Sequence, residues 1–399
     1  MLAKASRVDA DVPSPPAGIM TKTASRGGCW PTDEQTLLLR ASLLSGAPAI
    51  EAYDTWRVRV ALEKLDRGSF RLLPLLAQNL GRHDVRGSLV ERIESMQRET
   101  RSRNAVLMSR LRMPLTSFAQ LGLDTIILKG SALLTLYYQD LGLRPMSDLD
   151  VLVRTEDVET AMALLRRSGW TSQIDTPECV VPVTHSLLFQ DVEATRLDLH
   201  WHVLWESCGP GMDQEFWAGA VSTTIAGVPT AALCPADQLF HVCVHGVAWN
   251  PVPPLRWAAD AVLVLRTASP GVAWERLLMQ ARRLRLVLVL RKALAFLQSA
   301  LDIPVPEEVL TSLQAWPISM IERLEYRARL RPWGRLGALP RQVCHYVRLS
   351  RAAGQRPRLL GFPRYLQQLY GLARLRDLPP ELRRRLRQRP DATSPRPTT

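Results

Sequence analysis

The chain has 399 residues, of which 46% are hydrophobic and 22% are charged, a composition typical of a soluble globular protein with two or three folding units. Its formal net charge of +13 is concentrated at one end. Residues 322–399 hold 19 arginines and 5 acidic side chains, whereas residues 1–321 hold 32 basic and 33 acidic ones. The total charge therefore says little about a polyanionic partner. No run approaches the ~18 apolar residues of a membrane span, and the polar start lacks a signal-peptide pattern, so we expect a cytoplasmic protein.

Residues 1–32 are rich in small and polar side chains, and we expect them to form a disordered lead. Between residues 33 and 121, apolar side chains recur at intervals of three and four, a spacing that predicts an N-terminal helical region. The predicted helices span residues 34–44, 58–65, 72–80 and 90–121. Ser88 and Glu91 predict a capping box at the start of the last of these helices, and Pro114 is expected to kink or divide it.

The pattern changes at residues 122–233, where short apolar and alternating runs predict β-strands. The predicted strands span residues 125–128, 149–153, 184–190 and 196–201, and the predicted helices between them span 132–138 and 156–167. This order of elements predicts an α+β (mixed α/β) core in which helices pack against a mixed sheet.

Helical periodicity returns at residues 234–330 and predicts a C-terminal helical region. The predicted helices span residues 236–247, 255–267, 274–301 and 306–324. Residues 331–399 form an Arg-rich basic segment, of which 391–399 are expected to be a disordered tail.

Three aspartates and a glycine-serine turn carry the chemistry that the sequence indicates. Asp148 and Asp150 lie two residues apart at the start of a predicted strand, and Asp198 lies within another apolar strand. Carboxylates in this arrangement bind hard divalent cations such as Mg²⁺, and three of them can complete a two-metal site. Gly130 and Ser131 follow a strand and precede a helix, where backbone N–H groups and a hydroxyl suit phosphate oxygens.

Several segments resemble the bacterial uncharacterised nucleotidyltransferase family, which belongs to the DNA-polymerase-β-like nucleotidyltransferase superfamily. The resemblance depends first on residues 128–132 (Leu-Lys-Gly-Ser-Ala), 142–153 (Gly-Leu-Arg-Pro-Met-Ser-Asp-Leu-Asp-Val-Leu-Val) and 197–201 (Leu-Asp-Leu-His-Trp). It continues in residues 240–246 and 255–260, and it extends over about 33 to 320.

This resemblance implies a polymerase-β-like core flanked by N- and C-terminal helical regions. It places the metal carboxylates at Asp148, Asp150 and Asp198, and the nucleotide-binding turn at Gly130 and Ser131. The implied reaction is Mg²⁺-dependent transfer of a nucleoside monophosphate from an NTP to an unidentified acceptor, with two ions bound. Asp198 would help to deprotonate the acceptor. Members of the family are often encoded near genes of peptide or polysaccharide biosynthesis.

Other side chains near these motifs have two interpretations each. Lys129 either binds phosphate or is a charged strand-end residue, and Arg144 either binds a triphosphate or pairs with Asp140 or a neighbouring acid. Asp260 either faces the cleft or pairs with a basic partner.

Two pairs of histidines have spacings that merit separate consideration. His200 and His202 alternate on one strand, whereas His241 and His245 lie four residues apart on a helix. For both pairs we favour structural packing or hydrogen bonding over metal binding, because no Glu follows His241 as a helical zinc motif requires.

Two other functions remain open from the sequence. One is a non-catalytic binding or scaffold protein with the same fold, and the other is a nucleic-acid-modifying or toxin-like nucleotidyltransferase that uses the basic segment. A solvated, arginine-biased segment is the preferred interpretation of residues 331–399, so nucleic acid is not the favoured partner.

Overall fold

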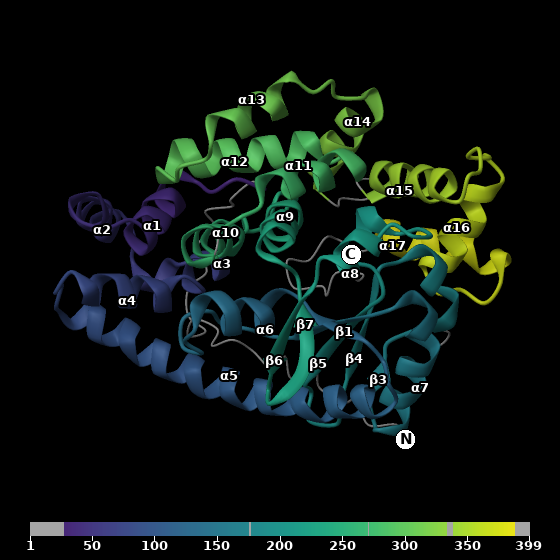
Figure 1. Ribbon diagram of the computed structural model, residues 1–399, viewed down its shortest axis with the longest axis horizontal. Helices are drawn as coiled ribbons and strands as arrows, with labels where there is room; N and C mark the ends of the chain where they lie inside the picture. Colours follow the sequence, from purple (N-terminus) through teal and green to yellow (C-terminus); the bar gives the residue numbers. More distant parts are fainter. Residues whose placement is uncertain (1–27, 175–176, 270, 333–337, 388–399) are drawn as a thin grey trace.

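The computed structural model of the protein describes residues 28–174, 177–269, 271–332 and 338–387 (Figure 1). The predicted lead lies outside these residues up to position 27, and the predicted tail at 391–399 lies outside them altogether. The described part of the chain begins within the last residues of the predicted lead. Gly28 forms a β-bridge with Asn250 and Cys29 is buried, so the folded part of the chain includes these residues.

Helices precede, interrupt and follow a single sheet. The helices before the sheet are α1 (Asp33–Leu43), α2 (Ala47–Arg59), α3 (Arg67–Phe70), α4 (Leu73–Arg82) and α5 (Ser88–Gln120). The helices between the strands are α6 (Lys129–Leu133), the π-helical turn η2 (Leu134–Tyr138), α7 (Val158–Arg167) and α8 (Gln214–Ala218). The helices that follow are α9 (Pro235–Gly246), α10 (Arg256–Thr267), α11 (Trp274–Arg283), α12 (Val287–Leu301), α13 (Glu307–Ala315), α14 (Met320–Arg329), α15 (Ala338–Ala352), α16 (Gly361–Leu369) and α17 (Leu378–Arg387).

In the described part of the chain, seven strands form one sheet with the order β3-β4-β5-β2-β1-β7-β6. The strands are β1 (Thr125–Ile127), β2 (Leu149–Val153), β3 (Thr171–Ser172), β4 (Ser186–Gln190), β5 (Arg196–His200), β6 (Val221–Ile225) and β7 (Val228–Ala232). β2 is parallel to β5 and β1 is parallel to β7, whereas the other neighbours are antiparallel. This mixed sheet confirms the predicted mixed α/β fold class.

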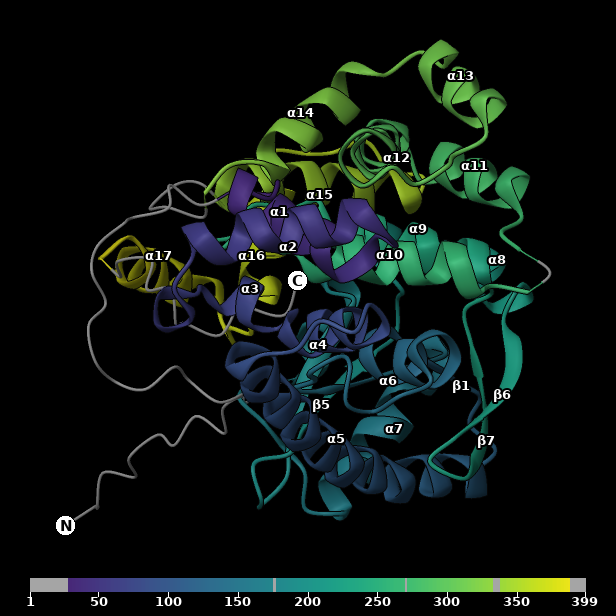
Figure 2. The same cartoon turned by 90° about the vertical axis from the view of Figure 1, so that its left-hand side faces the viewer.

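The two faces of the sheet are covered by different helices, because side chains alternate along each strand. Ile126 and Leu152 face a core built by α1, α4, α9, α10 and α12, whereas Ile127 and Val151 face α7 and the second half of α5. Both views show α5 running along one side of the sheet and the larger helical layer on the other (Figures 1 and 2). Because α1 packs against α10 and α12, the N- and C-terminal helices share one core.

Several predicted helix boundaries are wrong. The helix predicted at 58–65 lies instead at α2, where Pro48 in the first turn and the buried Ala49, Ala52 and Trp56 give a helical apolar face. The capping box at Ser88 does not form, since the N-cap of α5 is Gly87 with φ of 143°, and α5 continues through Pro114.

Two of the predicted C-terminal helices are each divided. Residues 274–301 form α11 and α12, which are separated by a turn in which Arg285 has a left-handed φ of 52°. Residues 306–324 form α13 and the start of α14, with Pro317 in the connection.

The basic segment packs against the body through α15, α16 and α17. Tyr365, Leu366 and Leu378 form a small core with Val183. Among the described residues no helix is both long enough and apolar enough to cross a membrane.

Candidate active site

The turn between β1 and α6 directs Lys129 toward the sheet. The Leu128 amide donates a backbone hydrogen bond to the Asp150 carbonyl (3.0 Å), which holds the end of β1 against β2. Lys129 then adopts a left-handed φ of 44°, a conformation that side-chain-bearing residues rarely occupy. The chain reverses at this residue and begins α6, so that the Lys129 ammonium lies over neighbouring strands instead of in solvent.

Asp150 and Asp198 lie side by side because β2 and β5 are parallel and pair these two residues directly. The residues that alternate with them, Val151, Leu197 and Leu199, face the core beneath the sheet. Both carboxylates therefore point into the space between the sheet and the larger helical layer. Asp150 is buried, and the Asp198 side chain is 13% exposed.

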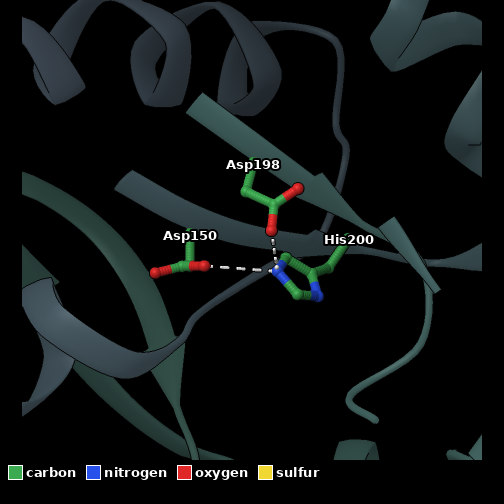
Figure 3. Close-up of side chains that lie close together, drawn as sticks. All are labelled: Asp150, Asp198 and His200. Carbon is green, nitrogen blue, oxygen red and sulfur yellow. Dashed lines mark hydrogen bonds and ion pairs between the residues drawn. The ribbon is translucent and has the colours of Figure 1, made fainter. Parts of the chain in front are cut away.

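His200, two residues after Asp198 on β5, completes the cluster (Figure 3). Its Nε2 atom lies 3.3 Å from Asp150 Oδ1 and 3.0 Å from Asp198 Oδ2. The Lys129 Nζ atom lies 2.6 Å from Asp150 Oδ1 and 3.7 Å from Asp198 Oδ2. Two carboxylates, one ammonium group and one imidazole thus share a site with little access to water.

The charges in this cluster shift one another's pKa values. Burial alone would raise the pKa of Asp150, but the neighbouring Lys129 and His200 lower it. The pKa of Asp198 is likewise lowered, against the effect of burial, chiefly by His200 and Lys129. In return, burial would lower the pKa of His200, but the carboxylate of Asp198 raises it. The two aspartates therefore stay ionised at neutral pH.

Several buried polar atoms around the cluster have no hydrogen-bond partner among the described residues. They include Asp198 Oδ1, His185 Nδ1 and both ring nitrogens of His241. Burial lowers the pKa of His241 to about 3, so its ring is neutral. Since a buried polar atom without a partner is costly, these atoms are suited to bind a ligand or an ion that enters the site.

Asp150, Asp198 and His200 fit a divalent cation, since one ligand atom from each lies within 4.8 Å of the others. Carboxylate oxygens suit Mg²⁺, and the imidazole nitrogen also suits Mn²⁺ or Zn²⁺. Of the three predicted carboxylates, the structure brings together Asp150 and Asp198 but leaves Asp148 outside this group.

Asp148 is half-buried at the start of β2, and its Oδ1 accepts a hydrogen bond from the Ser147 hydroxyl (3.3 Å). Burial and the neighbouring Asp150 raise its pKa. His200 was not predicted as a ligand, although its alternation with Asp198 on one strand was a signal for it.

The predicted nucleotide-binding turn is closely packed. A Cβ atom on Gly130 would lie 2.7 Å from Met146 Sδ and 3.0 Å from Arg144 Nη1, so a larger residue fits at this position only if Met146 shifts. Ser131 is fully buried, and its Oγ lies 4.0 Å from the same sulfur. Met146 must therefore move before the Ser131 hydroxyl can contact a phosphate.

Arg144 is paired with Asp260 of α10 and not with Asp140. Its Nε and Nη2 donate to the two oxygens of Asp260 at 2.7 and 2.9 Å, and the Tyr138 hydroxyl donates to Oδ1 at 2.7 Å. This buried bidentate pair ties the loop before β2 to α10, so the Arg144 donors that face Asp260 are already used.

Arg256, at the start of α10, is a candidate anion-binding residue that sequence analysis missed. Its Nη1 donates to the Pro145 carbonyl (2.7 Å), and it forms no ion pair with any described residue. Burial, together with the nearby Arg71 and Arg144, lowers its pKa to about 9. The positive charges of these arginines repel one another, and an anion bound between them would relieve this repulsion. The place is therefore favourable for an anion.

The other histidine spacings do not form metal sites in the described structure. His202 Nδ1 hydrogen-bonds to Asp213, and the rings of His241 and His245 make an edge contact with centroids 6.1 Å apart. These contacts agree with the roles that the sequence favoured for His202 and for the pair on the helix, whereas His200 belongs to the group that could hold a metal ion, a role that the sequence did not favour.

The chain was compared with families of known proteins. The family described as "Uncharacterised nucleotidyltransferase" matches residues 69–302, which is more than half of the chain. The matched part begins in α3, includes every strand of the sheet and the Asp150–Asp198–His200 cluster, and ends directly after α12. No protein with a curated description matches the chain.

Proposed function

The chain belongs to the uncharacterised nucleotidyltransferase family, and from this premise we propose that it transfers a nucleoside monophosphate from an NTP to an acceptor hydroxyl, using a divalent cation. The observation that carries the proposal is the direct pairing of Asp150 with Asp198 on parallel strands, beside the unpartnered Asp198 Oδ1. Buried carboxylates that are held ionised at neutral pH are the groups that such a reaction requires.

The reaction forms a bond between the acceptor oxygen and the α-phosphorus, and it breaks the bond between the α-phosphorus and the oxygen that bridges to the β-phosphate. Pyrophosphate leaves with that electron pair, and the proton of the acceptor hydroxyl passes to the Asp198 carboxylate. Mg²⁺ ions held by the carboxylates would supply charge neutralisation of the triphosphate. Asp198 Oδ1 is free to accept a hydrogen bond from the acceptor hydroxyl and to orient it.

One positive side chain and one glycine turn support binding of the triphosphate. Arg256 lies beside the loop that precedes Asp148, with two of its guanidinium nitrogens left for other partners. Gly130 has no side chain, so its backbone can approach a phosphate once Met146, whose Sδ would lie 2.7 Å from a Cβ at this position, has moved. We propose that the phosphates bind between Gly130 and Arg256, with Met146 displaced from Ser131.

The test uses the purified full chain with each of the four ribonucleoside triphosphates. Calorimetry should show binding of NTP that requires Mg²⁺, and pyrophosphate release should fall by at least ~100-fold in Asp150→Asn and in Asp198→Asn. The exposed Asp84→Asn is the matched control and should leave both measurements unchanged. If the wild-type chain binds no NTP in the presence of Mg²⁺ or Mn²⁺, the proposal fails.

A second function is favoured by two contacts at the site. The Lys129 ammonium already compensates Asp150, and Met146 covers Ser131, as would suit a binding protein of this fold that performs no catalysis. NTP binding without pyrophosphate release, across acceptor mixtures from cell extract, would support that alternative. A nucleic-acid acceptor remains the third possibility, tested by adding RNA and DNA to the same assay.

A further inference from the structure

A pocket of about 300 Å³ lies beside the carboxylate cluster and contains none of its side chains. One wall is a face of α5 that includes Met96, Thr100 and Leu107, spaced so that they project from one side of the helix. The loop 145–147 and the turn 193–196 form the other walls. Its volume is large enough for a small molecule.

The position of the pocket connects it with the candidate active site. Ser147, in its wall, directly precedes Asp148. Arg196, also in its wall, lies two residues before Asp198 on β5, and the two side chains project from the same face of the strand. The pocket therefore borders the residues at the start of β2 and β5, where an acceptor group would have to approach the carboxylates.

The lining of the pocket is apolar with an excess of positive charge. Phe70, Met96 and Leu107 provide apolar surface. Three arginines line the pocket against one carboxylate, and two of them are engaged, Arg110 with Thr195 and Glu193, and Arg103 with Glu99.

Arg196 differs from the other two arginines. Its half-buried side chain makes no hydrogen bond or ion pair with any residue in the described ranges, although Asp198 lies on the same strand. A guanidinium group in an apolar pocket without a partner is suited to bind an anionic group of a ligand, because the bonds are charge-assisted and little water competes for them.

The nucleotide is not the molecule that this lining fits. An NTP carries a highly charged triphosphate, whereas the pocket offers one unpaired guanidinium group among apolar walls. In addition, the Met146 side chain packs on Gly130 and also lines the pocket, so the nucleotide-binding turn and the pocket lie on either side of it. Two substrates can then occupy two adjacent places.

We propose that this pocket binds the acceptor, a small molecule with an apolar body and one anionic group that Arg196 holds. The anionic group is a carboxylate or a phosphate monoester, both of which a guanidinium fork binds in the same way. The identification of the ligand as the acceptor rests on the proposed nucleotidyl transfer, whereas the binding of an apolar anion does not.

The probe is 8-anilinonaphthalene-1-sulfonate, an apolar anion whose fluorescence rises when it enters an apolar site. Titration of the full chain should show binding that weakens by about tenfold in Arg196→Gln, the value of one charge-assisted contact. Thr100→Trp fills the pocket and should abolish the same binding. Arg112→Gln, on an exposed position of α5 outside the pocket, is the matched control and should bind the probe as the wild type does.

Competition identifies the ligand class and the role of the pocket. Competition with phenylphosphate and with phenylacetate distinguishes a phosphate ligand from a carboxylate ligand. If neither compound displaces the probe, the proposed ligand chemistry is wrong. Saturating Mg-NTP should leave the probe bound, whereas displacement would assign the pocket to the nucleotide and overturn the acceptor role. If the probe binds to Arg196→Gln and Thr100→Trp as it does to the wild type, the pocket proposal is wrong, whether or not the chain binds Mg-NTP. If the chain binds no Mg-NTP but still binds the probe in a way that depends on Arg196, the proposed nucleotidyl transfer is wrong, and so is the acceptor role of the pocket.

Discussion

Replacing Lys129 with methionine removes the ammonium group that lies 2.6 Å from Asp150 while keeping the length of the side chain. Removal of one partner of a buried ion pair costs about 3–5 kcal/mol, because the other charge is left uncompensated. Asp150 retains His200 at 3.3 Å, so the cost should lie near the lower value, about 3 kcal/mol. With an unfolding entropy of roughly 2.1 cal/mol/K per residue, a chain of 399 residues should melt about 4 °C lower.

The assay compares melting midpoints of the wild type, Lys129→Met and Lys292→Met without divalent cations and then with MgCl₂ or MnCl₂. Lys292 is exposed on α12 and serves as the control. A bound cation should restore the stability of Lys129→Met and should bind to it more tightly than to the wild type, because no ammonium competes for Asp150. Equal midpoints for the two lysine variants without cations would refute the reasoning, as would a cation affinity that Lys129→Met does not increase.

Three further changes test the packing and charge around the site. Gly130→Ala should destabilise the protein by about 1–3 kcal/mol in thermal unfolding, because its Cβ would meet Met146 Sδ at 2.7 Å, and Met146→Ala should relieve the loss. Asp260→Asn should cost about 3–5 kcal/mol, since it leaves the buried Arg144 without its carboxylate, and a loss below about 1 kcal/mol would contradict this pairing. The raised pKa of His200 predicts a stabilising contribution that is full below about pH 6.5 and is lost as the pH rises through the folded-state value. Melting curves at increasing pH should therefore decline less steeply in His200→Gln than in the wild type.

The pairing of β2 with β5, the strands that hold the candidate site, follows closely from local sequence. Residues 149–153 form β2 with the predicted bounds, and residues 196–200 form β5, one residue shorter than predicted. Apolar side chains on one face and acids on the other make the register of these strands costly to change, because a shift of one residue would bury the carboxylates in the opposite core. The approach of Asp150 to Asp198 was therefore within reach of sequence analysis.

Two kinds of feature were not predicted: a local turn without a sequence signal, and pairings between residues far apart in the chain. The hairpin of β6 and β7 turns at Ala226 and Gly227, both with positive φ, and an alanine there lacks the turn signal that asparagine or aspartate would give. The pairing of Arg144 with Asp260 joins residues 116 positions apart. Sequence analysis could name an acidic partner for Arg144 only by proximity along the chain, and it considered Asp140, which instead pairs with Arg101.

Pairings between distant residues also determine the role of the charge of the chain. Part of the positive charge near the C-terminus belongs to the fold, because Arg329 pairs with Glu206, Arg348 pairs with Glu325 at the base of α15, and His345 stacks on Trp205 with centroids 3.7 Å apart. These arginines compensate acids of the body and cannot be released to a polyanion without breaking buried contacts. At the candidate active site, compensation is instead local and comes from side chains within or directly beside β2 and β5. The net charge of +13 therefore does not by itself locate a site, whereas the candidate site is marked by buried polar atoms without a partner among the described residues, such as Asp198 Oδ1.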